Sequence, residues 1–222
     1  MRKMSWGAWR AVITCITYNN LHLTGRAFSS QFILRHKAFI ERQSYNVRTY
    51  QRREYDQYDT PATIYLVYES ASGTALGVSR LMPAEHACML RDLWPELIAD
   101  SRIPDWQTVW EGTRFCIDSS LPPSQRAQIK NELVLAYLEL GLHMGISHIV
   151  GLMPRYILRA VFQHSGVEYQ PLGPVKDIDG IKTQAAVMAV TYEQLQNVRK
   201  ITNITSPVLD SSCLGGVTSA AA

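Results

Sequence analysis

The sequence predicts an α/β fold in which a mixed β-sheet carries helices on both faces. The first observation is a hairpin, because residues 62–69 and 74–82 read as strands and the turn sequence Ser-Ala-Ser-Gly separates them. The second is a pair of strand–helix–strand transitions after the hairpin, which indicates a sheet covered by helices. The third is the length, since 222 residues suit one α/β domain with a full core or two very small ones.

The N-terminal part is expected to contain a strand, a helix and a long loop. Residues 11–18 are rich in Val, Ile and Thr, which is typical of a strand. A helix is expected to begin at Thr24 or Gly25, because apolar residues then recur at roughly helical steps. These residues are Phe28, Phe32, Leu34, Ala38 and Phe39. Residues 45–59 are polar, rich in Tyr and without period, so we expect a long loop, and such loops are often functional.

The C-terminal part alternates strands and helices. Pro122 and Pro123 open the clearest helix, and Gly145 is placed to end it. Strands are expected at 108–117, 148–153 and 184–191, and helical segments at 89–99, from Pro154 to Gly166, and at 192–200. Residues 1–202 are therefore expected to form a single domain. Residues 203–222 are rich in Ser, Thr, Gly and Ala without period, which predicts a disordered tail.

Composition argues against several classes of function. The formal net charge is only +3, which does not indicate a nucleic-acid binder, although a weakly basic surface could attract an acidic partner. No apolar stretch approaches the ~18 residues needed to cross a bilayer, so no membrane span is expected. At the N-terminus a strand is favoured over a signal peptide, because Arg10 interrupts the apolar residues. The four cysteines lack CxxC spacing, which indicates reduced thiols in a cytoplasmic protein.

Charged residues stand out within strand-like, apolar sequence. Only 18% of the chain is charged, yet Glu111 and Arg114 lie in one predicted strand and Arg80 ends another. Burying an unpaired charge is costly, so these residues predict a polar pocket inside an apolar frame. Residues three apart on a strand point to opposite faces, so either a bulge re-aims one of them or each has its own partner. Glu111 could form a structural ion pair with Arg80, or be a catalytic carboxylate whose pKa is raised by burial.

An acidic trio, Glu54, Asp56 and Asp59, crowds into the predicted loop. One interpretation is a solvated loop whose acids cap local turns. The other is a site for an organic cation, which neighbouring tyrosines could contact with their ring faces. No His accompanies the trio at ligand spacing, so we expect no metal site. Arg35 and Phe39 are one helical turn apart and therefore share a helix face.

Together, these spacings resemble the N-acyl-homoserine lactone synthases, the autoinducer synthases of bacterial quorum sensing. The family pattern has Arg and Phe on the first helix, a following aromatic residue, Glu-x-Asp-x-x-Asp, a strand ending in Arg-Leu, and Glu-x-x-Arg-Phe. The corresponding segments here read LRHKAF, EYDQYD, SRLMP and WEGTRF, and the match covers roughly residues 12–190. Tyr45 stands where the family usually has Trp, and Trp94 where it usually has Phe, so we expect a pocket of altered shape.

The resemblance implies an acetyltransferase-like fold, a three-layer α-β-α sandwich with a mixed, twisted sheet. It implies two substrates, S-adenosylmethionine and an acyl thioester on acyl carrier protein or CoA, and no permanently bound cofactor. The methionyl amine would attack the thioester carbonyl, and the carboxylate would then displace the sulfonium, closing the lactone and releasing methylthioadenosine. The alternatives are an acyltransferase of similar fold that uses another amine, and a non-catalytic protein that senses a ligand.

The resemblance also assigns roles to residues. The catalytic candidates are Glu111, Asp59, Arg114 and Arg80. The substrate-binding candidates are Arg35, Phe39, Tyr45, Glu54, Asp56, Trp94 and Gly151. Glu111 is the candidate base, and Arg80 would hold the carboxylates in place. The acidic trio would attract the sulfonium and the ammonium, and Arg35 or Arg114 would pair with the substrate carboxylate. The aromatic candidates would wall the pocket for S-adenosylmethionine.

The acyl chain needs an apolar tunnel, for which residues 150–153 and the helix around Leu133 and Tyr137 are candidate walls. In the family, a Thr at the position of Gly151 tends to accompany 3-oxo chains, so Gly151 favours unsubstituted acyl groups. Arg155 and Arg159 lie one turn apart and could dock an acidic carrier protein. Alternatively, they belong to an ordinary solvated helix face.

Overall fold

The computed structural model describes residues 13–98, 103 and 105–210, and its centre is a mixed β-sheet. The sheet runs in the order β1, β4, β5, β6, β7, β10 and β8, and β9 pairs with β10. The strands are β1 (Ile13–Ile16), β4 (Ile64–Glu69), β5 (Ala75–Pro83), β6 (Val109–Ile117), β7 (His148–Pro154), β8 (Gln170–Pro171), β9 (Lys176–Ile178) and β10 (Ile181–Ala189). β6 and β7 are parallel, and the other described pairs of the sheet are antiparallel. The expected mixed sheet is confirmed.

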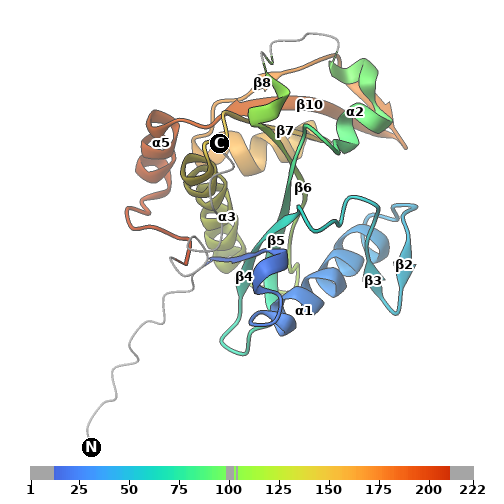
Figure 1. Cartoon of the computed structure of the whole chain (residues 1–222), viewed down its shortest axis with the longest axis vertical. Coiled ribbons are helices and arrows are strands. Elements are labelled where there is room, and N and C mark those ends of the chain that lie inside the picture. The colour runs from blue at the N-terminus through green and yellow to red at the C-terminus, as the bar shows by residue number, and fades with distance from the viewer. Residues whose placement is uncertain (1–12, 99–102, 104, 211–222) are drawn as a thin grey trace, which may run out of the picture.

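Helices cover both faces of the sheet, as predicted. The long helix α1 (Gly25–Arg35) packs on β4, β5 and β6 from one side, and α3 (Pro123–Met144) lies on the other side with α5 (Tyr192–Thr202) (Figure 1). Because β-strand side chains alternate between faces, neighbouring residues of one strand enter different cores. Leu66 packs toward α3, whereas Val67 packs toward α1.

The helix α3 begins and ends where the sequence predicts. Pro123 occupies its first turn, where a missing N–H costs no helical hydrogen bond. Gly145 follows the last turn with φ +70°, a left-handed conformation that favours glycine. Between these ends, the side chains from Leu133 to Leu138 are buried, because α3 contacts the sheet and α5 as well. The helix therefore supplies a rigid layer behind β5 and β6.

Two helices contain π-helical turns, which are rare and frequent at functional sites. The first is η2 (His36–Glu41), which continues α1. The second is η5 (Leu158–Phe162), which follows the short α4 (Arg155–Ile157) and precedes η6 (Gln163–Ser165). Shorter helical segments are η1 (Tyr18–Asn20), α2 (Met89–Leu93), η3 (Pro95–Ile98) and η4 (Trp106–Thr108). The predicted helical segment at 89–99 thus corresponds to α2 and η3, and residue 99 lies outside the described residues.

Three features differ from the expectation. The predicted loop 45–59 contains a hairpin of β2 (Thr49–Tyr50) and β3 (Arg53–Glu54). The short strands β8 and β9 were not predicted, because two or three residues give no readable alternation. The third difference is that part of the predicted tail contacts β1.

Residues 203–210 of the predicted tail are part of the fold. Ile13 donates its N–H to the carbonyl of Val208, and Asp210 donates its N–H to the carbonyl of Ile13. Glu139 of α3 accepts the N–H groups of Val208 and Leu209. A prediction from composition missed this, because two backbone–backbone hydrogen bonds and one carboxylate hold the segment rather than a periodic apolar face. The rest of the predicted tail, 211–222, and residues 11–12 of the predicted first strand lie outside the described residues.

Within residues 13–98, 103 and 105–210, no helix combines the length and the hydropathy that crossing a bilayer requires. Cys15, Cys88 and Cys116 are buried and form no disulfide among the described residues, and Cys213 lies outside these residues. The three described cysteines therefore contribute to packing rather than to cross-links.

Candidate active site

A bulge in β6 brings Arg114 to the same side of the sheet as Glu111. Val78 of β5 lies opposite Cys116, but Arg80 lies opposite Thr113, so β6 has one extra residue between these two pairs. Arg114 lies inside this interval with φ +54°, a conformation that is strained for a residue other than glycine. The structure shows both alternatives that the spacing left open, because the bulge re-aims Arg114 and each of the two residues has its own partners.

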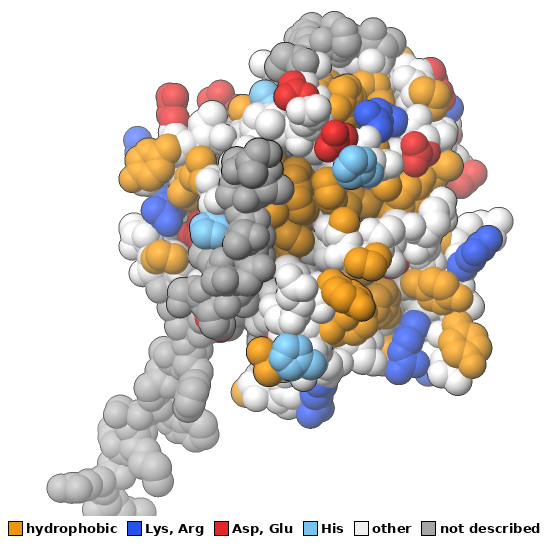
Figure 2. All heavy atoms as spheres, viewed as in Figure 1, with side chains coloured by type: hydrophobic (Ala, Val, Ile, Leu, Met, Phe, Trp, Pro, Cys, Tyr) orange, Lys and Arg blue, Asp and Glu red, His pale blue; other side chains and the backbone are white. Residues whose placement is uncertain are grey.

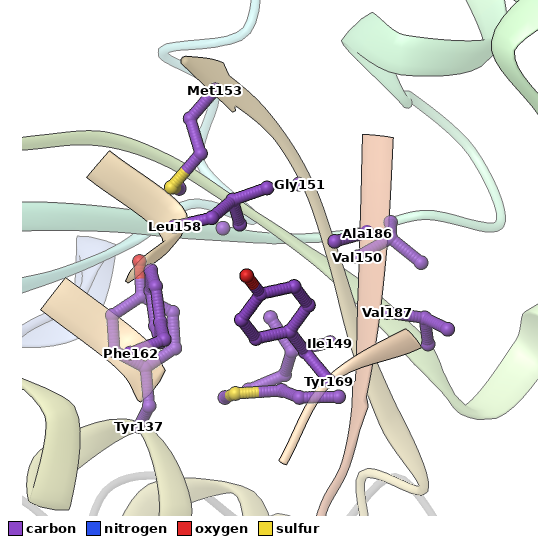
Figure 3. A pocket seen from close by; sticks show the side chains of 12 residues that line it. Tyr137, Ile149, Val150, Gly151, Met153, Leu158, Phe162, Tyr169, Ala186 and Val187 are labelled. Atoms are coloured by element: carbon purple, nitrogen blue, oxygen red, sulfur yellow. The ribbon is translucent and has the colours of Figure 1, made fainter. Parts of the chain in front are cut away.

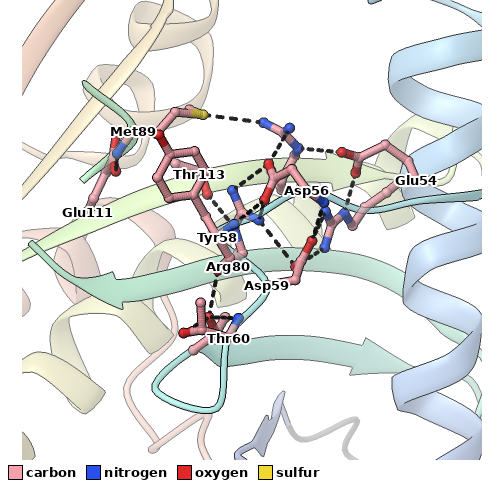
Figure 4. Close-up of polar contacts among 12 residues, drawn as sticks. Glu54, Asp56, Tyr58, Asp59, Thr60, Arg80, Met89, Glu111 and Thr113 are labelled. Carbon is pink, nitrogen blue, oxygen red and sulfur yellow. Dashed lines mark hydrogen bonds and ion pairs between the residues drawn. The ribbon is translucent and has the colours of Figure 1, made fainter. Parts of the chain in front are cut away.

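Three arginines and the acidic trio form one network next to this bulge (Figure 4). Arg35 donates to Glu54 at 2.5 Å and binds both oxygens of Asp59 at 2.7 and 2.9 Å. Arg80 donates to both oxygens of Asp56 at 2.5 and 3.1 Å. The third arginine, at the bulge, donates to Glu54 at 3.0 Å and to Asp56 at 2.7 Å. The residues come from α1, β3, the following loop, β5 and β6, so the network ties α1 and the β2–β3 hairpin to two neighbouring strands of the large sheet.

The network neutralises its own charge. The three carboxylates face three guanidinium groups, and each of the six carboxylate oxygens accepts at least one hydrogen bond. Burial alone would raise the pKa of Asp59, but the bonds and charges of Arg35 and Arg80 outweigh burial and lower it. The pKa of Asp56 is lowered in the same way, by Arg80 and Arg114 against burial. As the first interpretation expected, the acids cap local turns, because Asp59 accepts the N–H of Asp56 and Asp56 accepts the N–H of Tyr58. They do not lie in solvent, however, and the arginines compensate their charge, while a cation site stays a prediction.

The three arginines differ in what they can still bind. Arg35 and Arg80 have fully buried side chains, and each uses its Nε and both terminal nitrogens on partners inside the network. Arg114 has a side chain that is 10% exposed, and its Nη1 contacts only the thioether sulfur of Met89, at 3.9 Å. Sulfur is a weak acceptor. Arg114 is therefore the arginine with donors left for a further anion.

Glu111 is held apart from the network by the start of α2. Its carboxylate accepts the N–H groups of Met89 at 2.6 Å and Leu90 at 2.9 Å. No ion pair with Arg80 is found among the described residues, so the structural ion pair that the sequence left open is not formed. Burial raises the pKa of Glu111 to about 7, although the two backbone bonds work against the shift. A carboxylate with this pKa can accept a proton near neutrality.

Aromatic and sulfur side chains flank Arg114. Phe39 and Tyr45 stack with ring centroids 5.7 Å apart, and the guanidinium of Arg114 lies 5.6 Å from the Phe39 ring. On the other side, Trp94 packs against a cluster that contains Tyr58 and Met89. The space-filling view shows apolar side chains across the middle of this face, between the α1 half and the α2 half (Figure 2). Phe39 thus contacts Arg114 directly, and Trp94 packs with Met89, which contacts Arg114 from the other side; their role as walls of a substrate pocket stays a prediction.

An apolar pocket lies on the opposite side of the sheet, where β6 and β7 part. The two strands pair only from Val109 to Glu111, and they diverge at Gly112 and Gly151. A methyl group on Gly151 would lie 3.0 Å from the carbonyl oxygen of Gly112, so glycine allows this close approach. Tyr137 of α3 lines the pocket, as predicted for the tunnel wall (Figure 3). Leu133 belongs to the core and is not among the lining residues.

The charge network, the carboxylate at α2 and the pocket can be compared with known proteins. A family model described as autoinducer synthase matches residues 20–198. The chain belongs to the autoinducer synthase family. It is 30% identical to an acyl-homoserine-lactone synthase of Pseudomonas aeruginosa, over 72% of this chain and 77% of that relative. It is 26% identical to an isovaleryl-homoserine lactone synthase of Bradyrhizobium diazoefficiens, over 83% of this chain and 82% of the relative.

A solved structure supports the fold of this autoinducer synthase. It is a CoA-dependent acyl-homoserine lactone synthase with S-adenosylmethionine and isopentyl-CoA. The two chains superpose with a TM-score of 0.79 at 24% identity, over 93% of this chain and 98% of the other. The acetyltransferase-like α/β fold that the sequence predicted is confirmed.

The remaining candidates of the autoinducer synthase lie away from the network. Arg155 begins α4 and Arg159 lies in η5, and both are exposed. Tyr156, between them, is 61% exposed and lies close enough to Tyr45 to raise the pKa of its phenol, after the larger effect of burial. This surface therefore borders the region that Tyr45 walls. In the part of the chain that the structure describes, no group of three His, Cys, Asp or Glu side chains could hold a metal ion.

Several residues of the site were missed by sequence reasoning. Thr113 accepts the Nε–H of Arg80 at 2.8 Å, and Tyr65 donates its hydroxyl to Asp59 at 2.8 Å. Tyr58, one of the tyrosines that the sequence offered for a cation, lies with its ring 5.9 Å from the guanidinium of Arg80 and donates its hydroxyl to Asp92. Thr113 could have been found, because it stands between Glu111 and Arg114 in the same motif. Tyr65 could not, because its role depends on which strand or helix lies beside it.

Proposed function

We propose that this chain synthesises an N-acyl-homoserine lactone from S-adenosylmethionine and an acyl thioester, and releases methylthioadenosine. Membership of the autoinducer synthase family supports the activity. The observation that carries the mechanism is the position of Glu111, a buried carboxylate with a pKa of about 7, beside Gly112, where the apolar pocket begins. The Glu111 carboxylate can accept a proton near neutrality, and the adjacent pocket can hold a fatty acyl chain.

The first step is acyl transfer. The methionyl amine loses a proton to Glu111, and the amine nitrogen attacks the thioester carbonyl. A C–N bond forms, the C–S bond breaks, and the thiol leaves with a proton. Both oxygens of Glu111 already accept a backbone N–H, but a carboxylate offers about four lone-pair sites, so acceptor capacity remains. The backbone bonds orient the carboxylate, and burial supplies the basicity.

The second step closes the lactone. A carboxylate oxygen of the acylated donor attacks the carbon next to the sulfonium, a C–O bond forms, and the C–S bond breaks to release neutral methylthioadenosine. Arg114 is the residue we assign to the donor carboxylate, because its Nη1 has no strong acceptor. We therefore favour Arg114 over Arg35, the other arginine that the sequence left open for this carboxylate. Arg35 and Arg80 instead fix the acidic trio, and through it the position of Arg114.

The donor would lie between the two apolar walls. Phe39 and Tyr45 form one wall, and Trp94 with its neighbours forms the other. Asp56, whose side chain is 10% exposed, and Asp59 would contribute to the field felt by the ammonium and the sulfonium. Because the arginines compensate these acids, we assign them chiefly to holding the frame.

The acyl chain would pass Gly112 and Gly151 into the pocket on the α3 side. Gly151 offers no hydroxyl to a 3-oxo group, so we assign unsubstituted acyl groups to this chain. Arg155 and Arg159 are placed to dock an acidic carrier protein. CoA is a second donor to test, because one structural neighbour is CoA-dependent. The reduced, buried cysteines support a cytoplasmic location, which we propose for the protein.

The direct test is to incubate the purified chain with S-adenosylmethionine and either hexanoyl-CoA or hexanoyl carrier protein, and to identify the products by mass spectrometry. We expect a lactone and methylthioadenosine with at least one donor. Acyl transfer to other amines without any need for S-adenosylmethionine would instead establish the second candidate, an acyltransferase of similar fold. Ligand binding without turnover, unchanged in Glu111→Gln, would establish a sensor.

A further inference from the structure

Three aromatic rings line the apolar pocket. Tyr137 comes from α3, Phe162 from η5, and Tyr169 from the segment just before β8 (Figure 3). Tyr137 and Phe162 meet edge to face with centroids 6.1 Å apart, and Phe115 contacts both from behind. The hydroxyls of Tyr137 and Ser79 are hydrogen-bonded to each other, and Ser79 donates in turn to the carbonyl of Thr113. Two of the three rings are therefore fixed in the core.

Tyr169 differs from the other two rings because it is only partly buried. Its backbone is nevertheless anchored on both sides. Val167 donates its N–H to the carbonyl of Phe162 at 3.0 Å, and Glu168 donates to the side chain of Gln194 at 2.8 Å. On the other side, β8 pairs with β10. The ring is thus held at the open side of the pocket, and its backbone is fixed although the ring itself is not locked in the core.

The pocket is small. Its cavity volume is about 30 Å³, far below the ~300–1000 Å³ that ligand pockets span. Its floor is formed by β7 and β10 side chains, among them Ile149, Met153 and Met188. An acyl chain that enters past Gly151 therefore meets buried core side chains on two sides of the pocket. On the third side it meets the ring of Tyr169. Only the third side can be opened by a substitution without creating a cavity in the core.

We propose that the ring of Tyr169 limits the length of the acyl group that the pocket can hold. The enzyme would then accept short acyl groups and reject long ones. The inference rests on the proposed function, because it names the substrate class of that site. Each methylene that cannot be buried forfeits about 0.8 kcal/mol, or roughly fourfold in kcat/KM. A few excluded methylenes are then enough for strong discrimination.

The test is a competition assay with butanoyl, hexanoyl, octanoyl and decanoyl thioesters, in which all lactones are measured in one reaction. Wild type should favour the shorter two. Tyr169→Ala should raise the decanoyl-to-hexanoyl ratio by about 10- to 100-fold. Tyr169→Phe is the matched control, because it keeps the ring and removes only the hydroxyl, and its ratio should equal that of wild type. If Tyr169→Ala does not fold, Tyr169→Leu should shift the ratio in the same direction.

Three results would overturn the inference: a wild type that prefers decanoyl, a folded Tyr169→Ala or Tyr169→Leu with the wild-type ratio, or Tyr169→Phe that shifts as far as Tyr169→Ala. Binding of the same acyl chains as pantetheine thioesters, measured by calorimetry, gives a second readout. If no lactone forms from any donor, the proposed function fails. The calorimetric data would still test the inference in that case. They would show whether wild type binds short acyl chains more tightly than long ones, and whether Tyr169→Ala loses this preference.

Discussion

Replacing Asp59 by Asn should destabilise the protein strongly, although the two side chains have nearly the same shape. Asp59 accepts two hydrogen bonds from Arg35, at 2.7 and 2.9 Å, and one from the hydroxyl of Tyr65 at 2.8 Å. An amide presents one oxygen and one NH₂ group, so it cannot accept both bonds from a guanidinium. Arg35, whose side chain is fully buried, would keep only Glu54 as a carboxylate partner.

The expected cost follows from this loss. Removing one member of a buried ion pair costs about 3–5 kcal/mol, because the other charge stays buried. That is a large share of the roughly 5–15 kcal/mol by which a domain is stable. For a chain of this size it corresponds to a Tm lower by about 6–20 °C.

Urea denaturation followed by tryptophan fluorescence measures the effect. Glu41→Gln is the matched control, because Glu41 pairs with Arg52 at an exposed site, and its unfolding midpoint should equal that of wild type. Folding lowers the pKa of Asp59 from its ordinary value of 3.8, so the stability it contributes is present above that value. The contribution is lost as the pH falls through the lowered pKa, and the two proteins should then converge. A midpoint for Asp59→Asn equal to that of wild type at pH 7 would refute the reasoning.

Three further perturbations test the site. Since Glu111 has a pKa of about 7 and must be ionised to accept a proton, kcat should fall as the pH drops below 7, and Glu111→Gln should lose about 10²–10⁴-fold with no such profile. A flat wild-type profile would exclude Glu111 as the base. Arg114→Lys should raise the KM for S-adenosylmethionine more than it lowers kcat, because one ammonium cannot replace the guanidinium fork; an unchanged KM would remove the carboxylate assignment. Gly112→Ala should destabilise by about 1–3 kcal/mol, because its methyl group would lie 2.7 Å from the ring of Tyr137; chemical denaturation with an unchanged midpoint would contradict this packing.

The sequence predicted the elements that depend on local pattern. The hairpin of β4 and β5 and the ends of α3 follow from turn residues, periodicity and helix-end chemistry, which are local properties. The hairpin of β2 and β3 could not be read, because Gln51 and Arg52 occupy its turn with positive φ, where Asn-Gly is the recognisable signal. Residues 208–210 were missed for a related reason, since their partners lie on β1 and α3.

The residues of the site were likewise predictable where a sequence motif marks them, and not predictable where their role depends on distant partners. The resemblance selected the residues of the network, and the structure brings Arg35, Asp59 and Arg80 together. The sequence could not tell which arginine keeps free donors, because that depends on the partners of every guanidinium nitrogen. The bulge was left open for a similar reason, since it is defined by the register between β5 and β6. Tyr169 was not found at all, because it lies in irregular sequence and gains its position from β10 and α5.

The most direct test of the central claim is the stoichiometry of a single turnover. Enzyme in excess over S-adenosylmethionine and an acyl thioester is quenched at intervals, and free thiol, methylthioadenosine and acylated product are quantified together. The account predicts one thiol, one methylthioadenosine and one acyl-homoserine lactone per donor consumed, with all three suppressed in Glu111→Gln. Release of thiol without methylthioadenosine, or an acylated amine other than the lactone as the final product, would contradict it.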